Sequence, residues 1–187
     1  MAKLIWHTTM SLDGFIAGPD HAMEWVFEYP EGPGDTTVAD VIRATGAILA
    51  GRNSYDVGER EGQVAEATEP FGGAWSGPQF VLTHHPPAES PDPSITFLEG
   101  DIDAAADTAL AAAGGRNVLV FGANTARQCL EAGRLDEVLV HIAPVLLGEG
   151  VRLYGDPPAP RVELERIGVG APGENVTILR FSVGRRL

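Results

Sequence analysis

The fold is decided by one stretch of the sequence, NVLVFGANTARQCL, which runs from Asn117 to Leu130. It begins as an unbroken apolar run with β-branched residues, which is typical of a strand buried on both faces of a parallel sheet. After Gly122 the pattern becomes helical. A strand that leads directly into a helix leaves the first backbone N–H groups of that helix without intrahelical partners, and such helix ends bind anions. The stretch therefore predicts a strand–helix unit, with either an ordinary tight turn or an anion seat at Gly122.

Two other apolar runs end in a similar way. Residues 46–51 end at Gly51 and are followed by Arg52, Asn53 and Ser54, while residues 79–83 lead into His84 and His85. Ligands of open α/β sheets bind beyond the carboxyl ends of the strands. We therefore expect phosphate-binding groups at three strand ends, namely Gly51, Arg52, Asn53 and Ser54, then Thr83, His84 and His85, then Gly122, Ala123, Asn124 and Thr125. None of them matches the Gly-x-Gly-x-x-Gly dinucleotide fingerprint or the P-loop.

The rest of the chain predicts an α/β fold. Strands are expected at residues 4–10, 94–98, 135–142, 162–167 and 176–181, and helices at residues 38–45 and 102–113. Asp35 and Asp101 stand where N-caps of the two helices would be. The last two strands alternate apolar and charged residues and are joined by glycines and a proline, which predicts an antiparallel hairpin. The sum is a mostly parallel, helix-covered sheet with antiparallel strands at its C-terminal edge.

Composition limits the possible functions. The chain has 187 residues, of which 44% are hydrophobic, and this suffices for one buried core and one domain. The formal net charge of −13 repels nucleic acids and anionic membranes, so neither is expected as a partner. A phosphorylated small molecule would therefore have to be held by local groups, such as helix N-termini and Arg52 or Arg127.

The number and spacing of cysteines and histidines do not indicate a metal site. Cys129 is the single cysteine, which excludes an internal disulfide and a Cys-x-x-Cys site. The five histidines are dispersed, and His7 and His141 fall in predicted strands, where we expect hydrogen-bonded sheet residues. No apolar run has membrane-spanning length and the N-terminus lacks the pattern of a signal peptide, so we expect a cytoplasmic protein.

Two segments near the N-terminus are candidates for contact with a substrate. Residues 11–20 place glycines on both sides of an apolar triplet, which predicts a loop folded over the sheet edge. Within it, Asp13 either caps the turn or contacts a substrate. Residues 23–27 contain Trp25 and Phe27, which form either a short core helix or an open aromatic shelf for a flat heterocycle.

Six pieces of the sequence carry a family resemblance when taken in order. They are residues 11–18 (SLDGFIAG), 51–55 (GRNSY), 81–83 (VLT), 120–123 (VFGA), 135–137 (LDE) and 144–150 (PVLLGEG). Together they resemble the dihydrofolate-reductase-like superfamily and, within it, the RibD C-terminal family of riboflavin-biosynthesis reductases. The resemblance spans nearly the whole chain, and its specificity lies in the combined order of the pieces.

This resemblance implies a dihydrofolate-reductase-like fold over residues 1–187, with a mostly parallel mixed sheet, helices on both faces and a C-terminal antiparallel hairpin. It implies an NADPH-dependent reductase, usually a homodimer, acting on a heteroaromatic or ribosylated pyrimidine-like substrate such as 5-amino-6-(5-phosphoribosylamino)uracil. It places Arg52, Asn53 and Ser54 at the cofactor phosphates, Thr83 and His84 toward the adenosine 2′-phosphate, and Gly122 and Ala123 at the pyrophosphate. The loop of residues 12–18, with Ala17, would cover the nicotinamide.

Two alternatives remain open. The family usually has a second glycine where this chain has Ala123, and this departure, with the absence of an unambiguous proton donor, favours a non-catalytic binder of a nucleotide, flavin or other heterocycle on the same fold. Dihydrofolate reduction requires a carboxylate on the helix after the first loop, and Asp35 stands nearest to that place. For the reductase, we expect Trp25 and Phe27 on the substrate side and proton delivery by Asp13 or a bound water.

Overall fold

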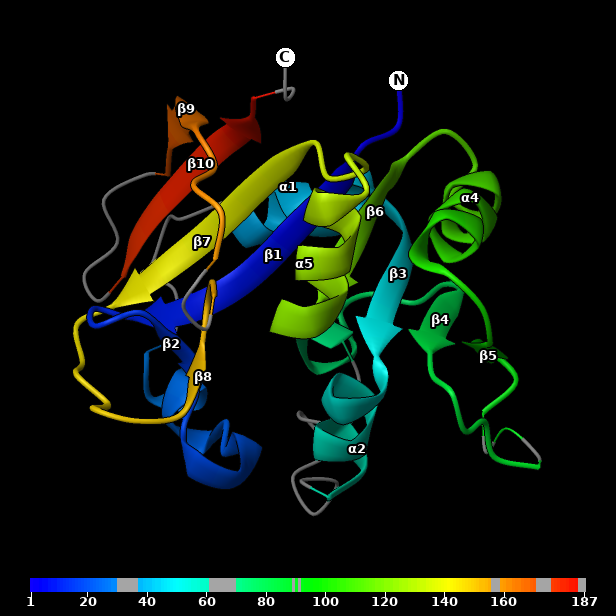
Figure 1. Ribbon diagram of the computed structural model, residues 1–187, viewed down its shortest axis with the longest axis horizontal. Helices are drawn as coiled ribbons and strands as arrows, with labels where there is room; N and C mark the ends of the chain where they lie inside the picture. The colour runs from blue at the N-terminus through cyan, green and yellow to red at the C-terminus, as the bar shows by residue number, and fades with distance from the viewer. Residues whose placement is uncertain are drawn as a thin grey trace.

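The computed structural model describes residues 1–29, 37–60, 70–88, 90, 92–155, 159–170 and 176–184. Its main feature is an eight-stranded sheet with the order β5-β4-β3-β6-β1-β7-β10-β9 (Figure 1). The strands are β1 (Leu4–Ser11), β3 (Thr45–Gly51), β4 (Gln79–Leu82), β5 (Ile95–Leu98), β6 (Asn117–Phe121), β7 (Glu137–Ala143), β9 (Leu164–Val169) and β10 (Thr177–Val183). The six strands from β5 to β7 in this order are parallel, β10 pairs antiparallel with β7, and β9 pairs antiparallel with β10.

Helices cover both faces of the sheet. The helices are α1 (Thr37–Ala44), α2 (Arg52–Arg60), α4 (Ile102–Ala112) and α5 (Ala123–Glu131), with short 3₁₀ turns η1 (Pro19–His21), η2 (Glu24–Glu28) and η3 (Pro70–Gly73). In Figure 1, α4 and α5 lie in front of the sheet and α1 lies behind it. A small second sheet pairs β2 (Phe15–Ala17) with β8 (Val151–Arg152).

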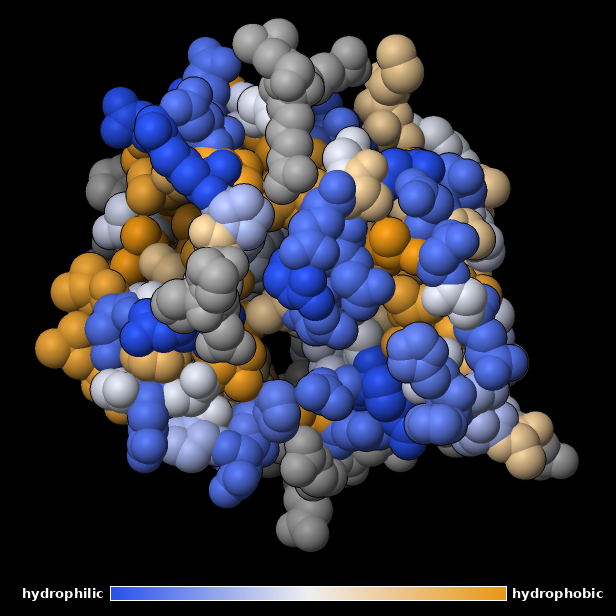
Figure 2. All heavy atoms as spheres, in the orientation of Figure 1, coloured by the Kyte–Doolittle hydropathy of each residue, from blue (hydrophilic) through white to orange (hydrophobic). Residues whose placement is uncertain are grey.

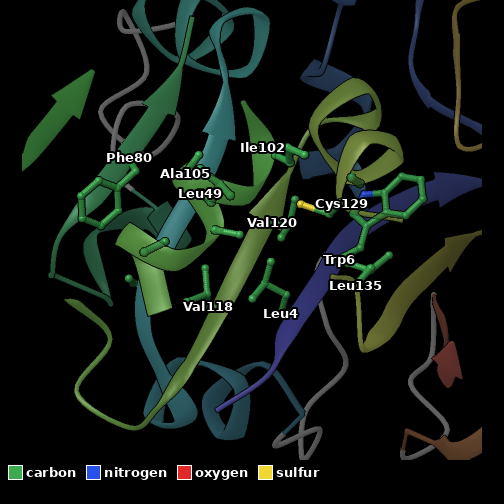
Figure 3. Packing of buried hydrophobic residues seen from close by; sticks show 14 of the residues in the cluster. Leu4, Trp6, Leu49, Phe80, Ile102, Ala105, Val118, Val120, Cys129 and Leu135 are labelled. Carbon is green, nitrogen blue, oxygen red and sulfur yellow. The ribbon is translucent and has the colours of Figure 1, made fainter. Parts of the chain in front are cut away.

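The core consists of two apolar layers, one on each face of the sheet. On the α4 side, Leu4, Leu49 and Val118 pack against α4 and α5 (Figure 3). Alanines on α4 let that helix approach closely, and a Cβ at Gly46 of β3 would meet the Ala113 carbonyl oxygen at 2.1 Å. On the α1 side, Ile5, Ile48 and Ile178 form the second layer with Trp75, whose Nε1 donates to the Thr45 carbonyl at 3.2 Å.

The predicted elements are confirmed with small corrections. Asp101 caps α4 by accepting from the Ala104 backbone N–H at 2.8 Å, and the C-terminal hairpin is present. Thr45 was expected on the helix of residues 38–45, but it begins β3, and its hydroxyl donates to the Val41 carbonyl at 2.6 Å. Residues 23–27 are not a core helix, since η2 has no buried residue. The short strands β2 and β8 were not predicted.

The buried carboxylate of Glu137 joins three strands at the amino end of β7. It accepts hydrogen bonds from Lys3 Nζ, just before β1, and from Arg180 Nε of β10 at 2.5 Å. Its side chain is 2% exposed, whereas that of Arg180 is 41% exposed. Burial alone would raise the pKa of Glu137, but the hydrogen bonds and charges of Lys3 and Arg180 outweigh it and hold the pKa below its usual value.

We predict that Arg180→Leu lowers the free energy of unfolding by about 1.5–3 kcal/mol at pH 7, because a buried carboxylate loses a charged partner. A carboxylate with a lowered pKa stabilises the fold above its unfolded-state pKa and loses that effect as the pH falls through its folded-state value. The difference between wild type and variant should therefore shrink below about pH 4.3. Urea unfolding at several pH values measures it. Arg161→Leu, which breaks an exposed pair with Glu163, is the matched control and should change little.

Candidate functional site

A cleft of about 1020 Å³ opens at the carboxyl ends of β1, β3, β4 and β6. Figure 2 shows the molecule hollowed in the middle of this face, between β8 and the ends of α5 and α2. The cleft brings together every residue predicted to bind the cofactor, namely Ala17, Gly51, Arg52, Asn53, Ser54, Thr83, His84, Gly122, Ala123, Asn124 and Thr125. These residues come from four separate segments of the sequence, and the fold places them around one space.

Two strand–helix junctions fit into each other at the centre of the cleft. A Cβ at Gly51, the end of β3, would lie 2.6 Å from Thr125 Oγ1 of α5. A Cβ at Gly122, the residue after β6, would lie 2.5 Å from Ser54 Oγ of α2. Each helix thus places a hydroxyl against the glycine of the other junction. Side chains at these positions would force apart the N-termini of α2 and α5, which supply the N–H groups of the site.

Gly122 is also required by its backbone conformation. It is the N-cap of α5 with φ 89° and ψ 137°, and no side chain caps the helix there. The first N–H groups of α5 therefore remain available to an anion. Ala123 is half-buried and packs against the core layer on the α4 side, so its methyl group takes part in the contact between helix and sheet.

The end of β4 is linked to the start of α2. Arg52 donates from Nη1 to the His85 carbonyl at 3.0 Å and from Nε to Asp56 at 2.7 Å, and its guanidinium lies 5.7 Å from the Tyr55 ring centroid. The hydroxyl of Thr83 accepts from the His85 backbone N–H at 3.1 Å. These contacts hold the β4 loop beside α2, so the two strand ends form one continuous wall.

The charge of the cleft is opposite to that of the protein. Of the described residues that line it, none is an aspartate or glutamate, whereas three are arginines (Arg52, Arg127 and Arg152) and four are histidines (His7, His21, His84 and His85). The chain as a whole has a formal net charge of −13. Arg127 is held along α5 by Glu131 and Asn124, and Arg152 lies 4.9 Å from the Phe15 ring centroid. An anionic ligand therefore meets local positive charge inside an acidic protein.

Aromatic rings form another wall of the cleft. His7 of β1 stacks on Phe71 with centroids 5.6 Å apart, and Phe121 at the end of β6 lies 6.4 Å from His7. The Nε2 atoms of His7 and His141 are 2.9 Å apart and share a hydrogen bond. Removal from water and the neighbouring His141 lower the pKa of His7 to about 3, so its ring is neutral at pH 7.

Comparison with known proteins assigns the family. A model of the RibD C-terminal domain matches residues 2–178. The chain belongs to the RibD C-terminal domain family. It is 29% identical over 155 residues to the uncharacterized protein YwjB of Bacillus subtilis (strain 168), covering 81% of this chain and 82% of that protein.

Solved structures share this fold. A candidate riboflavin biosynthesis protein from Shewanella sp. PV-4 has a TM-score of 0.78 at 23% identity, with 99% of this chain and 100% of that one covered. The diaminohydroxyphosphoribosylaminopyrimidine deaminase/5-amino-6-(5-phosphoribosylamino)uracil reductase of Thermotoga maritima has a TM-score of 0.62 at 13% identity, with 98% of this chain but 57% of that one covered. The dihydrofolate-reductase-like fold expected for this RibD C-terminal domain protein is confirmed.

Asp13 lies outside the group of residues that line the cleft. It accepts from the Ser11 hydroxyl at 2.6 Å and from the backbone N–H groups of Leu147 at 3.1 Å and Gly148 at 2.7 Å. The Ser11 hydrogen bond above all, with those backbone bonds, lowers the pKa of Asp13 to about 2. These contacts favour a structural role, in which Asp13 ties the first loop to the turn before β8.

The predicted aromatic shelf also lies apart from the cleft lining. Phe27 is 54% exposed, and neither it nor Trp25 is among the lining residues, although Met23 is. Trp25 is half-buried, with no hydrogen-bond partner for its Nε1 among the described residues. Asp35, the other predicted substrate residue, lies outside the described residues.

Sequence reasoning missed the segment after the turn of residues 144–150. Val151, Arg152, Leu153, Tyr154 and Gly155 all line the cleft, next to Gly150 at the end of the turn. Gly150 has φ 131°, and a Cβ there would lie 2.1 Å from the Ala17 carbonyl oxygen, so the glycine allows β8 to reach β2. The alternation of residues 151–154 after Gly148 and Gly150 was the available sign of a short strand. His7 was predicted only as a sheet residue, because its ring partners are distant in sequence.

The two junction glycines should respond differently to relief of their clashes. Gly51→Ala and Gly122→Ala should each destabilise the fold. Adding Thr125→Ala to Gly51→Ala removes the clashing hydroxyl and should restore most of the loss. Adding Ser54→Ala to Gly122→Ala should leave a cost of about 1–2 kcal/mol, because the positive φ remains. Urea unfolding of the four variants measures this, and full rescue at both sites would contradict a conformational requirement at Gly122.

Proposed function

We propose that this RibD C-terminal domain protein is an NADPH-dependent reductase of a heteroaromatic or ribosylated pyrimidine-like substrate. The observation that carries the proposal is the cleft without described carboxylates, in which two helix N-termini and three arginines meet in a chain of net charge −13. Its length along three strand ends suits a dinucleotide. Family membership supports a reductase, and the Thermotoga maritima relative in structure is named as 5-amino-6-(5-phosphoribosylamino)uracil reductase.

The residues of the cleft suit the parts of this cofactor. When bound, NADPH supplies the hydride. The N-termini of α2 and α5, with Ser54 and Thr125, would hold the pyrophosphate, and Thr83, His84 and Arg52 would hold the 2′-phosphate end. Ile16 and Ala17 of β2 would keep water from the nicotinamide end. Because Asp13 is ionised and tied to backbone N–H groups, we assign proton delivery to a water molecule.

A non-catalytic binder of the same ligands is the second candidate. Two observations favour it: the described lining holds no carboxylate to protonate a substrate, and Ala123 stands where the resemblance expects glycine. Such a protein would bind NADPH, yet leave it unoxidised with a panel of pyrimidines, pterins, flavins and quinones. Turnover with any member of the panel excludes this candidate.

Titration of NADPH and NADH against tryptophan fluorescence tests cofactor binding. We expect saturable NADPH binding, and His84→Ala and Arg52→Ala should each weaken it by about 10-fold, because each removes a hydrogen bond to a charged phosphate. NADH affinity should change less. Equal weakening of NADPH and NADH binding would indicate that these residues contact the pyrophosphate. Absence of saturable NADPH binding at millimolar concentration would reject the reductase proposal. Arg43→Ala, at an exposed residue of α1, is the matched control.

We also propose that the chain forms a homodimer through β9. This edge strand exposes Leu164, Ile167 and Val169 at 44%, 47% and 60%, and an exposed apolar edge is a site of association. Ile167→Lys should shift a dimer to monomer in sedimentation velocity at micromolar concentration. Leu146→Lys, at a residue 69% exposed away from β9, should not. A monomeric wild type contradicts the proposal.

Among the described residues, no helix is long and apolar enough to cross a membrane.

A further inference from the structure

One wall of the cleft is built from rings that the proposed cofactor contacts do not use. We call His7, Phe71 and Phe121 the ring wall. The centroids of His7 and Phe71 are 5.6 Å apart with an interplanar angle of 28°, and those of Phe71 and Phe121 are 6.3 Å apart at 64°. All three residues line the cleft. Such an offset cluster offers ring faces and edges to one further planar group.

The backbone of Phe71 is strained to hold its ring in place. Phe71 has φ 58° and ψ 37°, a left-handed conformation that an aromatic residue rarely adopts. Strain of this kind persists where surrounding contacts fix it, and it concentrates at functional sites. Here the stacking on His7 and the contact with the core layer on the α1 side fix the ring.

His7 adds a hydrogen-bonding atom to this wall. Its Nε2 is engaged with His141, and no partner of Nδ1 is recorded within the described part of the chain. Since the ring is neutral, Nδ1 either accepts or donates, according to which of the two Nε2 atoms carries the shared proton. A lactam, the C(=O)–N–H unit of many heterocycles, presents an acceptor beside a donor and so matches either tautomer.

The ring wall lies next to the proposed cofactor site. Phe121 directly precedes Gly122, and His7, Thr8 and Thr9 follow β1 toward Ile16 and Ala17 along the same cleft. A ring held by Phe121 and His7 would thus lie beside the loop expected to cover the nicotinamide. Neither Trp25 nor the exposed Phe27 is among the described residues that line the cleft.

We propose that the ring wall is a binding subsite for a planar heterocycle with a lactam edge, in which Phe71 and Phe121 contact the ring and His7 Nδ1 hydrogen-bonds the edge. Its role as the substrate subsite rests on the proposed reductase function. The binding itself does not, so it is tested on the protein without NADPH.

The probes are lumazine, a planar pteridinedione with lactam edges, and 1,3-dimethyllumazine, in which those nitrogens are methylated. Ligand fluorescence reports binding. Wild type should prefer lumazine by about 10-fold or more, because the methylated ring cannot make the edge hydrogen bond. His7→Phe keeps a ring but removes the nitrogen, so the preference should fall below about 3-fold. Phe71→Leu should weaken both ligands alike, whereas Phe181→Leu, the same change on β10, should weaken neither.

Several results would overturn the subsite. They are the absence of saturable lumazine binding, a preference that survives His7→Phe, or ligand affinities unchanged by Phe71→Leu. Weakening by Phe27→Leu but not by Phe71→Leu would move the heterocycle to the exposed shelf. His7→Phe also removes the partner of His141, so thermal unfolding checks its fold, and Phe71→Leu keeps the test independent of that pair. If the lumazine results are as expected but NADPH does not bind, only the reductase proposal is rejected.

Discussion

The shape of the cleft depends on two glycines, Gly51 and Gly122, because no side chain fits at either position. Parallel strands β3 and β6 are neighbours, and each leads at once into a helix, so the first turns of α2 and α5 compete for the same space. The hydroxyls of Thr125 and Ser54 occupy the positions where Cβ atoms would stand. This reciprocal fit brings two helix N-termini to one point. The first N–H groups of a helix have no intrahelical partners, so this fit gathers unpaired donors of two helices beside the cleft.

The cleft also differs from the rest of the protein in its charge. The chain has a formal net charge of −13, yet the described lining of the cleft carries no carboxylate. Arg52 and Arg127 are each held by a nearby carboxylate on their own helix, which fixes the guanidinium groups at the rim without placing the acids in the cleft. The proposed phosphorylated ligand would therefore meet local positive charge within an acidic protein. Reductase and non-catalytic binder share this requirement, and they differ in what happens at the ring wall.

In the first loop, the contacts of Asp13 hold the backbone in place and do not point to a catalytic role. Asp13 binds the backbone of Leu147 and Gly148, and Leu12 N–H donates to the Val145 carbonyl at 2.8 Å. Gly150 lets β8 approach Ala17 so closely that no side chain fits between them. The loop and the turn thus form one unit along the cleft. A carboxylate that accepts three hydrogen bonds remains ionised, which makes it a poor acid and a good anchor.

The sequence by itself determined the order of the elements, because apolar runs, caps and glycines are local signals. It also determined the three strand ends of the site, since strands that share a sheet and end in polar residues gather those residues at one edge. Only the tertiary structure decided that His7, Phe71 and Phe121 form a wall, that Asp13 is an anchor, and that Trp25 and Phe27 lie outside the cleft lining. The physical reason is that those outcomes depend on contacts between segments 50 to 134 residues apart, such as His7 with His141. Neither periodicity nor propensity encodes which side chains meet across the sheet.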